Sequence, residues 1–146
     1  MTTSYIGSVL DDITDGLAAR SGLQDVHVFS GPVSIEEAGT ECIAFGDARL
    51  TDSMVAMGSV KEETWEVDGE LYVVGVWQGD TEATIRASRD RILELFAEVE
   101  SYINDTYLGE FPDAEVTAGE LQQNIAAEGR ACRMTFNLTV LGIKNP

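Results

Sequence analysis

Apolar residues recur at helical spacing near the start of the chain. Between Thr2 and Arg20 the apolar positions are Ile6, Val9, Leu10, Ile13 and Leu17, and the opposite side carries Asp11, Asp12 and Asp15. This pattern is typical of an amphipathic helix with one buried stripe. Thr2, Thr3 or Ser4 can cap its start, and Gly22 can close it.

A second helical pattern runs from Glu82 to about Leu108. Gly79-Asp80-Thr81 interrupts the preceding strand pattern and supplies a cap, while Gly109 and Pro112 end the helix. The predicted buried stripe consists of Ile85, Ile92, Phe96, Val99 and Ile103. Glu82 and Arg86 stand four residues apart in the orientation that favours an ion pair.

Strand patterns occupy most of the remaining chain. Val26–Phe29 and Glu41–Phe45 are two short predicted strands. Thr64–Val67 and Glu70–Gln78 flank Asp68-Gly69, a pair typical of a two-residue hairpin turn. In the second arm Leu71, Val73 and Trp77 point to one face and Tyr72, Val74 and Val76 to the other. Because both faces are apolar, we expect this arm to lie centrally in the sheet with both faces covered.

The chain ends in a further predicted hairpin. Val116–Ala126 is a weak strand, Glu128-Gly129 a turn and Arg130–Ile143 a strong strand. In the last strand, apolar Met134, Phe136, Leu138 and Val140 alternate with polar Arg133, Thr135, Asn137 and Thr139. Such alternation indicates an antiparallel strand with one buried face.

One segment, Asp47–Ser59, has apolar residues but no sustained period. We predict a long loop, which is uncommon in a compact domain and often functional. Its apolar members, Leu50, Met54, Val55 and Met57, would need a partner for burial. They are therefore predicted to form a subunit or tube interface, with the loop mobile in the free subunit and ordered in an assembly.

Together these elements predict one α+β domain over residues 1–146. A single antiparallel or mixed sheet is packed by an N-terminal helix and one long helix, in the order α-β-β-β-β-α-β-β. A chain of 146 residues is long enough to bury one hydrophobic core without disulfides.

The charge balance narrows the classes of partner. With 26 Asp and Glu against 9 Lys and Arg, the formal charge is −17. Such a surface repels nucleic-acid backbone and anionic membranes, although it is compatible with DNA passing by without sticking. Met1–Tyr5 has no positively charged start of a signal peptide, and no apolar run could span a bilayer. We therefore expect a protein that is made and kept inside the cell.

No residue pattern predicts catalysis, a metal site or a cofactor. His27 is the only histidine, and Cys42 and Cys132 are far apart, so the usual zinc ligand sets are missing. Two buried free thiols are favoured for the cysteines, and a disulfide between two strands stays open. The pairs Asp11-Asp12 and Glu62-Glu63 are predicted to be solvated surface, because adjacent side chains diverge.

Other candidate binding patterns are weak. The glycines form no phosphate-binding loop, and Asp47 to Glu63 lacks the spacing of a calcium loop. Trp65, Tyr72 and Trp77 could stack on bases, but without nearby Lys or Arg they are better interpreted as packing or interface aromatics. The sequence thus predicts a protein that is not an enzyme.

The order of these elements resembles the tail terminator family of long-tailed bacteriophages, which includes minor tail protein U-like and head-to-tail joining proteins. The resemblance rests on the N-terminal helix ending at Leu17-Ala18-Ala19-Arg20, the strand Val26–Phe29 and the long middle segment. It continues through Trp65-Glu66-Val67-Asp68-Gly69-Glu70-Leu71-Tyr72-Val73-Val74, the helix beginning Asp80-Thr81-Glu82 and the strand Met134–Val140. It covers nearly the whole chain and is architectural.

The resemblance implies a structural virion protein without catalytic residues. It would form a homohexameric ring at the head-proximal end of the tail tube, stop tube growth and offer a docking surface for the head. Its partners would be the tail tube protein and a head completion or neck protein, and DNA would pass through without specific binding. The alternatives are another neck or tail-completion protein, or a cytosolic binding module or small enzyme with a pocket beneath Asp47–Ser59.

Overall fold

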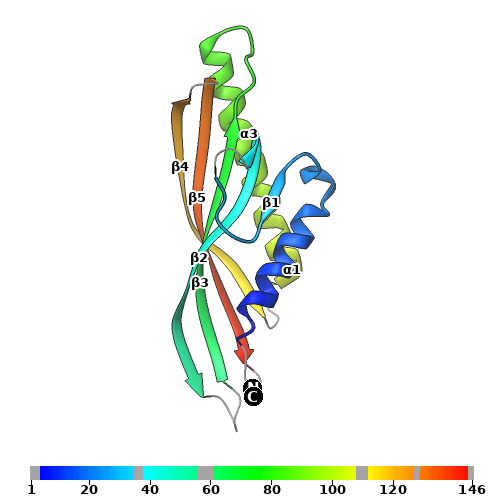
Figure 1. Cartoon of the computed structure of the whole chain (residues 1–146), viewed down its shortest axis with the longest axis vertical. Helices are drawn as coiled ribbons and strands as arrows, with labels where there is room; N and C mark the ends of the chain where they lie inside the picture. Colours follow the sequence, from blue (N-terminus) through cyan, green and yellow to red (C-terminus); the bar gives the residue numbers. More distant parts are fainter. Residues whose placement is uncertain (1–3, 35–37, 56–60, 108–111, 127–128, 145–146) are drawn as a thin grey trace.

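The computed structural model describes residues 4–34, 38–55, 61–107, 112–126 and 129–144. Its elements are α1 (Ile6–Ala18), the short helix η1 (Ser21–Leu23), β1 (His27–Phe29), β2 (Glu41–Val55), β3 (Lys61–Val74), α3 (Thr81–Tyr107), β4 (Asp113–Ala126) and β5 (Gly129–Lys144). They build one five-stranded sheet in the order β1-β2-β3-β5-β4 (Figure 1). β1 pairs with β2 in parallel and the other pairs are antiparallel. The predicted class, α+β with a single mixed sheet and two helices, is confirmed.

The predicted hairpin turn at Asp68-Gly69 is wrong, because β3 runs through both residues without a break. Three strands rather than four therefore precede α3 in the described chain. Gly69 pairs with Phe45 on one side and Phe136 on the other. A Cβ on Gly69 would clash with the Phe136 ring, so glycine is needed for close packing rather than for a turn.

The predicted loop over Asp47–Ser59 is also corrected. Residues 47–55 belong to β2, which pairs with β3 as far as Val55 opposite Lys61. The register shifts between Phe45 and Ala48 and again between Leu50 and Asp52. Each shift inserts one extra residue into β2, which exchanges the two faces and erases the period of two. Residues 56–59 lie outside the described residues.

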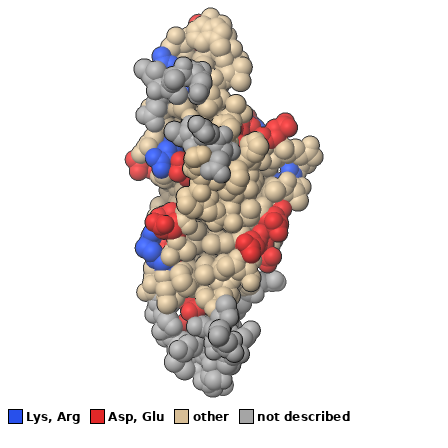
Figure 2. Space-filling model, in the orientation of Figure 1, with Lys and Arg blue, Asp and Glu red and all other residues tan. Residues whose placement is uncertain are grey.

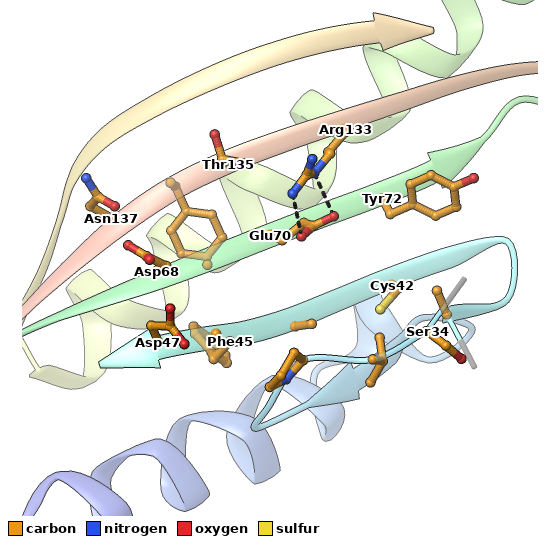
Figure 3. Close-up of a pocket in the computed structure, with 17 residues that line it drawn as sticks. Ser34, Cys42, Phe45, Asp47, Asp68, Glu70, Tyr72, Arg133, Thr135 and Asn137 are labelled. Carbon is orange, nitrogen blue, oxygen red and sulfur yellow. Dashed lines mark hydrogen bonds and ion pairs between the residues drawn. The ribbon is translucent and has the colours of Figure 1, made fainter. Parts of the chain in front are cut away.

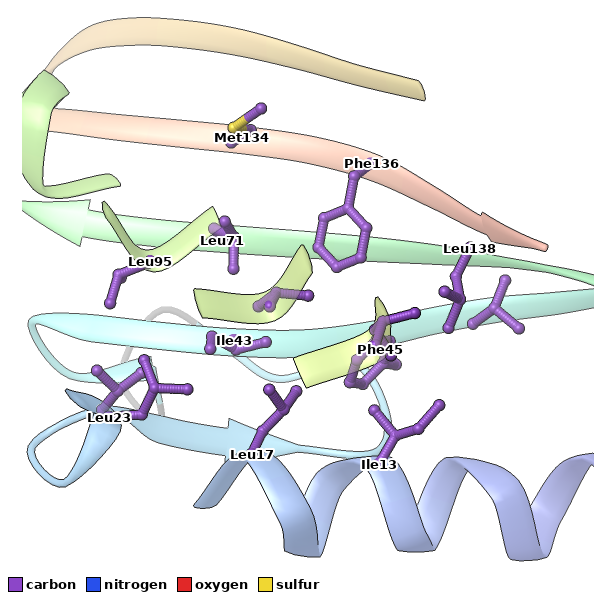
Figure 4. Close-up of a cluster of buried hydrophobic side chains, with 14 of the residues drawn as sticks. Ile13, Leu17, Leu23, Ile43, Phe45, Leu71, Leu95, Met134, Phe136 and Leu138 are labelled. Atoms are coloured by element: carbon purple, nitrogen blue, oxygen red, sulfur yellow. The ribbon is translucent and has the colours of Figure 1, made fainter. Parts of the chain in front are cut away.

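Both helices cover the same face of the sheet, hereafter the helix-covered face. The core contains Ile13 and Leu17 of α1, and Figure 4 shows them close to Ile43 and Phe45 of β2. From α3 the buried residues are Thr84, Ser88, Ile92, Leu95, Val99, Ile103 and Tyr107, whereas Ile85 and Phe96 are only partly buried. From β5 the alternating residues Met134, Phe136, Leu138 and Val140 are buried as predicted.

Polar contacts fix the helices on this core. The Ala83 backbone N–H donates to Asp80 Oδ1 at 2.8 Å, which confirms the predicted cap of α3. The Arg91 guanidinium donates to both Glu41 carboxylate oxygens, at 2.6 and 3.0 Å, and joins α3 to β2. This contact raises the pKa of Arg91. The predicted pair of Arg86 and Glu82 forms at 2.9 Å.

The predicted central place of Glu70–Gln78 is only partly right. β3 is the middle strand, and Val73 is buried while Tyr72 packs on a small cluster of Ala38, Cys42 and Ala44 on the opposite face. The strand ends at Val74, however, and Val76 and Trp77 are exposed. Cys42 and Cys132 are both free, and they lie in different clusters on opposite faces, which confirms the favoured interpretation.

Candidate functional site

The face of the sheet turned away from the helices, hereafter the open face, is polar. Arg133 of β5 forms an ion pair with Glu70 of β3 at 2.7 Å, and Arg49 of β2 forms one with Asp68 of β3 at 2.9 Å. The Arg49 hydrogen bond holds the pKa of Asp68 below its usual value. These pairs join neighbouring strands, so this part of the open face has a defined arrangement of charges, next to the apolar cluster of Ala38, Cys42 and Ala44.

A groove of about 690 Å³ lies on the open face. One wall is formed by Pro32, Val33 and Ser34, the segment that follows β1. The floor and the other wall come from β2, β3 and β5, and Figure 3 shows the Arg133–Glu70 pair and Tyr72 on that side. Its further lining residues are Ala38, Cys42, Ala44, Phe45, Gly46, Asp47, Asp68, Gly69, Thr135, Phe136 and Asn137. The groove is thus apolar on one side and charged on the other.

The side chains at this groove are poorly suited to covalent chemistry. Burial, with a smaller contribution from Glu70, raises the pKa of Cys42 to about 11. A thiol of this kind stays protonated at neutral pH and is a weak nucleophile. His27 lies exposed on β1, stacked on Phe29 with ring centroids 6.3 Å apart. Among the described residues no group of three or more His, Cys, Asp or Glu is placed to hold a metal ion.

The predicted interface residues that the structure describes fall on the far part of β2. Leu50 is 47% exposed and lies opposite Trp65 of β3. The Trp65 indole N–H is buried and has no hydrogen-bond partner among the residues that the structure describes. Met54 and Val55 continue β2, opposite Glu62 and Lys61, and Met57 lies outside the described residues. Three of the four residues are therefore collected on one strand.

The prediction that Glu63 is solvated, like Glu62, is wrong. Adjacent strand residues point to opposite faces, and Glu63 lies on the helix-covered face with only 4% of its surface exposed. Its carboxylate accepts a hydrogen bond from Ser4 Oγ at 2.9 Å, and Tyr5 Oη donates to its carbonyl at 2.6 Å. Burial and the charge of Glu63 raise the pKa of Tyr5. Ser4 and Tyr5 thus fasten the start of α1 to β3.

The segment between β3 and α3 exposes two large apolar side chains that the sequence pattern placed inside the sheet. Val76 is 75% and Trp77 65% exposed. Hydrogen bonds hold the backbone on both sides, from Gly75 N to Arg130 O at 2.6 Å and from Gln78 N to Thr84 Oγ1 at 3.0 Å. Gly79 follows with a φ of +99°. The two flanking glycines were the available signal that the strand ends here.

The acidic excess is unevenly distributed. Figure 2 shows a red patch without adjacent blue over α1, where Asp11, Asp12 and Asp15 are exposed. On the left of this view, red and blue atoms lie side by side at two places. The aspartates of α1 make no ion pair within the described part of the chain. Within that part, no helix is both long and apolar enough to cross a membrane.

Comparison with known proteins finds a similar fold in a virus-like particle. The structure is similar to a chain of the solved "Virion of native gene transfer agent (GTA) particle", with a TM-score of 0.62 and 13% sequence identity. The match covers 95% of this chain and 98% of that chain. No protein-family model and no curated protein matches the sequence. At this identity the likeness establishes a shared fold.

Proposed function

We propose that this chain is a structural virion protein of the tail terminator type. In this proposal six copies form a ring on the head-proximal end of the tail tube, stop its growth and present a surface to the head. The observation that carries the proposal is the shared fold with a chain of the gene transfer agent virion, because it extends over nearly the full length of both chains. Another neck or tail-completion role is the closest alternative.

The distribution of side chains supports an assembly role. Exposed Val76, Trp77 and Leu50 are apolar residues available for contacts between subunits. The far part of β2, with Leu50, Met54 and Val55, is the proposed contact with a neighbouring subunit or with the tube. The binding-module alternative places a pocket beneath a loop at Asp47–Ser59; residues 47–55 form a strand, and of these Asp47 lines the groove.

In a ring, some of the 26 carboxylates are proposed to line the channel. Like charge facing the DNA phosphates removes sticking points, whereas a basic lining would hold DNA through counterion release. The aspartates Asp11, Asp12 and Asp15 are the first to test, because they are exposed and make no ion pair among the described residues. Their replacement by lysine should leave the ring intact and slow DNA ejection, more strongly at low salt. Equal ejection rates at low salt would remove this part of the proposal.

Tube assembly tests the proposed function directly. Purified protein is examined by light scattering and by electron microscopy, alone and with polymerising tail tube protein. We expect rings in solution or on tube ends, and shorter tubes as the ratio of this protein to tube protein rises. A persistent monomer that leaves tube length unchanged and instead binds a small metabolite would contradict the proposal and favour the binding-module alternative.

A further inference from the structure

We propose that Val76 and Trp77 of one subunit insert into the open-face groove of the next copy of this chain. This inference rests on the proposed ring and adds the two surfaces through which neighbouring subunits would contact each other. A cyclic ring requires two different, complementary patches on each subunit, because its interface is heterologous. The projecting residues Val76 and Trp77, hereafter the knob, and the groove are such a pair.

The knob has the properties of an interface anchor. Tryptophan is enriched among the residues that dominate binding energy, and here its side chain is 65% exposed. Its backbone is already fixed by the bonds from Gly75 to Arg130 and from Gln78 to Thr84, and Gln78 Nε2 donates to Val76 O at 3.0 Å. A fixed segment loses little conformational entropy on binding.

The groove matches the knob in size and chemistry. Its volume of about 690 Å³ lies within the range of roughly 300–1,000 Å³ typical of pockets that hold drug-sized molecules. An indole with a neighbouring isopropyl group is no larger than such a molecule. Pro32, Val33 and Tyr72 offer apolar surface to it, as Figure 3 shows for Tyr72.

Charge favours a second copy as the occupant. Of the arginines in the described part of the chain, only Arg130 has no carboxylate within ion-pair distance, and its backbone carbonyl accepts the N–H of Gly75, the residue before the knob. At the groove, Asp68 and Glu70 are paired with arginines, whereas Asp47 forms no ion pair among the described residues and interacts with Arg49 at longer range. One copy therefore carries, next to its knob, the backbone of an arginine that has no ion-pair partner in the described chain and, at its groove, an aspartate that has none.

A charge exchange tests this pairing. Arg130→Glu and Asp47→Arg should each weaken ring formation, and the chain that carries both changes should recover it, because every contact then regains opposite charges. The recovery should decrease at high salt. If the double variant forms rings as poorly as the single variants, Arg130 and Asp47 are not close to each other in the assembly, which would argue against the proposed orientation.

The decisive experiment mixes two assembly-defective variants. In the knob variant, Val76→Ser and Trp77→Ser remove the apolar tip; in the groove variant, Thr135→Trp fills the groove from β5. Leu93→Ser is the control, because Leu93 is also exposed, at 42%, but lies on α3. Each defective variant alone should associate about 30-fold or more weakly than wild type, the loss expected for a buried tryptophan anchor. The control should form rings normally.

Mixed in equal amounts, the two variants should form one-to-one dimers and nothing larger, because only one intact knob can meet one intact groove. If Thr135→Trp fails to fold, as judged by circular dichroism, Ser34→Trp on the opposite wall replaces it. Rings that persist in both variants would overturn the inference and leave the proposed function standing. Two monomeric variants that form no dimer on mixing would mean that knob and groove do not meet. A wild-type chain that forms no ring would reject the proposed function itself.

Discussion

The two faces of the sheet are built from the same strands and are stabilised in different ways. On the helix-covered face Ile43, Leu71 and Leu138 have no exposed surface, so this face contributes most of the hydrophobic stabilisation. On the open face Glu70, Arg133 and Asp68 are half-buried or exposed and form pairs across strands. Because exposed ion pairs contribute little to stability, the open face can carry contacts with partners at small cost to the fold.

The adjacent residues Val73 and Val74 give the sharpest test of this difference. Val73 is 2% exposed on the helix-covered face, whereas Val74 is half-buried on the open face. Val73→Asp places an unpaired carboxylate in the core and should lower the free energy of unfolding by on the order of 3–5 kcal/mol. Val74→Asp should cost about 1 kcal/mol, the scale of strand propensity. Urea unfolding measures both, and equal losses would show that both faces are equally buried.

Gly69 tests how tightly the helix-covered face is packed. Gly69→Ala brings a methyl group against the Phe136 ring and should cost roughly 1–3 kcal/mol of unfolding free energy. Phe136→Leu removes the ring, so the double variant should lose less than the sum of the single losses. Gly46→Ala is the matched control, because the nearest atoms to its new Cβ lie at an ordinary 3.8 Å. Strict additivity would contradict the proposed contact.

Tyr5 tests the hydrogen bonds that close the helix-covered face near the start of α1. Its hydroxyl contacts the carbonyl oxygens of Glu63 at 2.6 Å and Val140 at 3.1 Å. Tyr5→Phe should cost about 0.5–1.5 kcal/mol. Since the folded-state pKa of Tyr5 is raised, its contribution is present at neutral pH and is lost as the pH rises above about 10, the usual tyrosine pKa. The alkaline fall in Tm should therefore be smaller in Tyr5→Phe; an identical fall would exclude this role.

Asp68 should give the smallest effect, because it lies on the open face. Its folded-state pKa is lowered by Arg49, so its contribution is present near neutral pH and lost as the pH falls through roughly 4 and below. Thermal unfolding of Asp68→Asn should lack this acidic component and become less sensitive to salt. Glu115→Gln is the control, since Glu115 is exposed and has no ion pair in the described chain. If both variants lose the same acid dependence, the Arg49 pair is not its cause.

The sequence by itself determined the features that depend on local periodicity and capping. The alternation from Met134 to Val140 fixes which face of β5 is buried, because strand side chains alternate strictly. The buried residues Ile92, Val99 and Ile103 of α3 follow from helix geometry, and its cap at Asp80 follows from a side chain that bonds three residues ahead. The mixed α+β class follows from the order of these patterns.

Only the tertiary structure determined where β2 and β3 run and where β3 ends. Asp68-Gly69 has the local sequence pattern of a turn. In the structure, however, Gly69 leaves space for the Phe136 ring and Asp68 accepts hydrogen bonds from Arg49, and neither partner is adjacent in sequence. The register shifts in β2 remove the alternating pattern by which a strand is recognised in the sequence. Pairing with β3, and not local alternation, determines which side chains of β2 lie on each face of the sheet. Trp77 fits the strand pattern but lies beyond Val74, where β3 ends and the next residue, Gly75, bonds the Arg130 carbonyl. Each outcome depends on a contact that local propensity does not encode, since the partner residue lies on another strand.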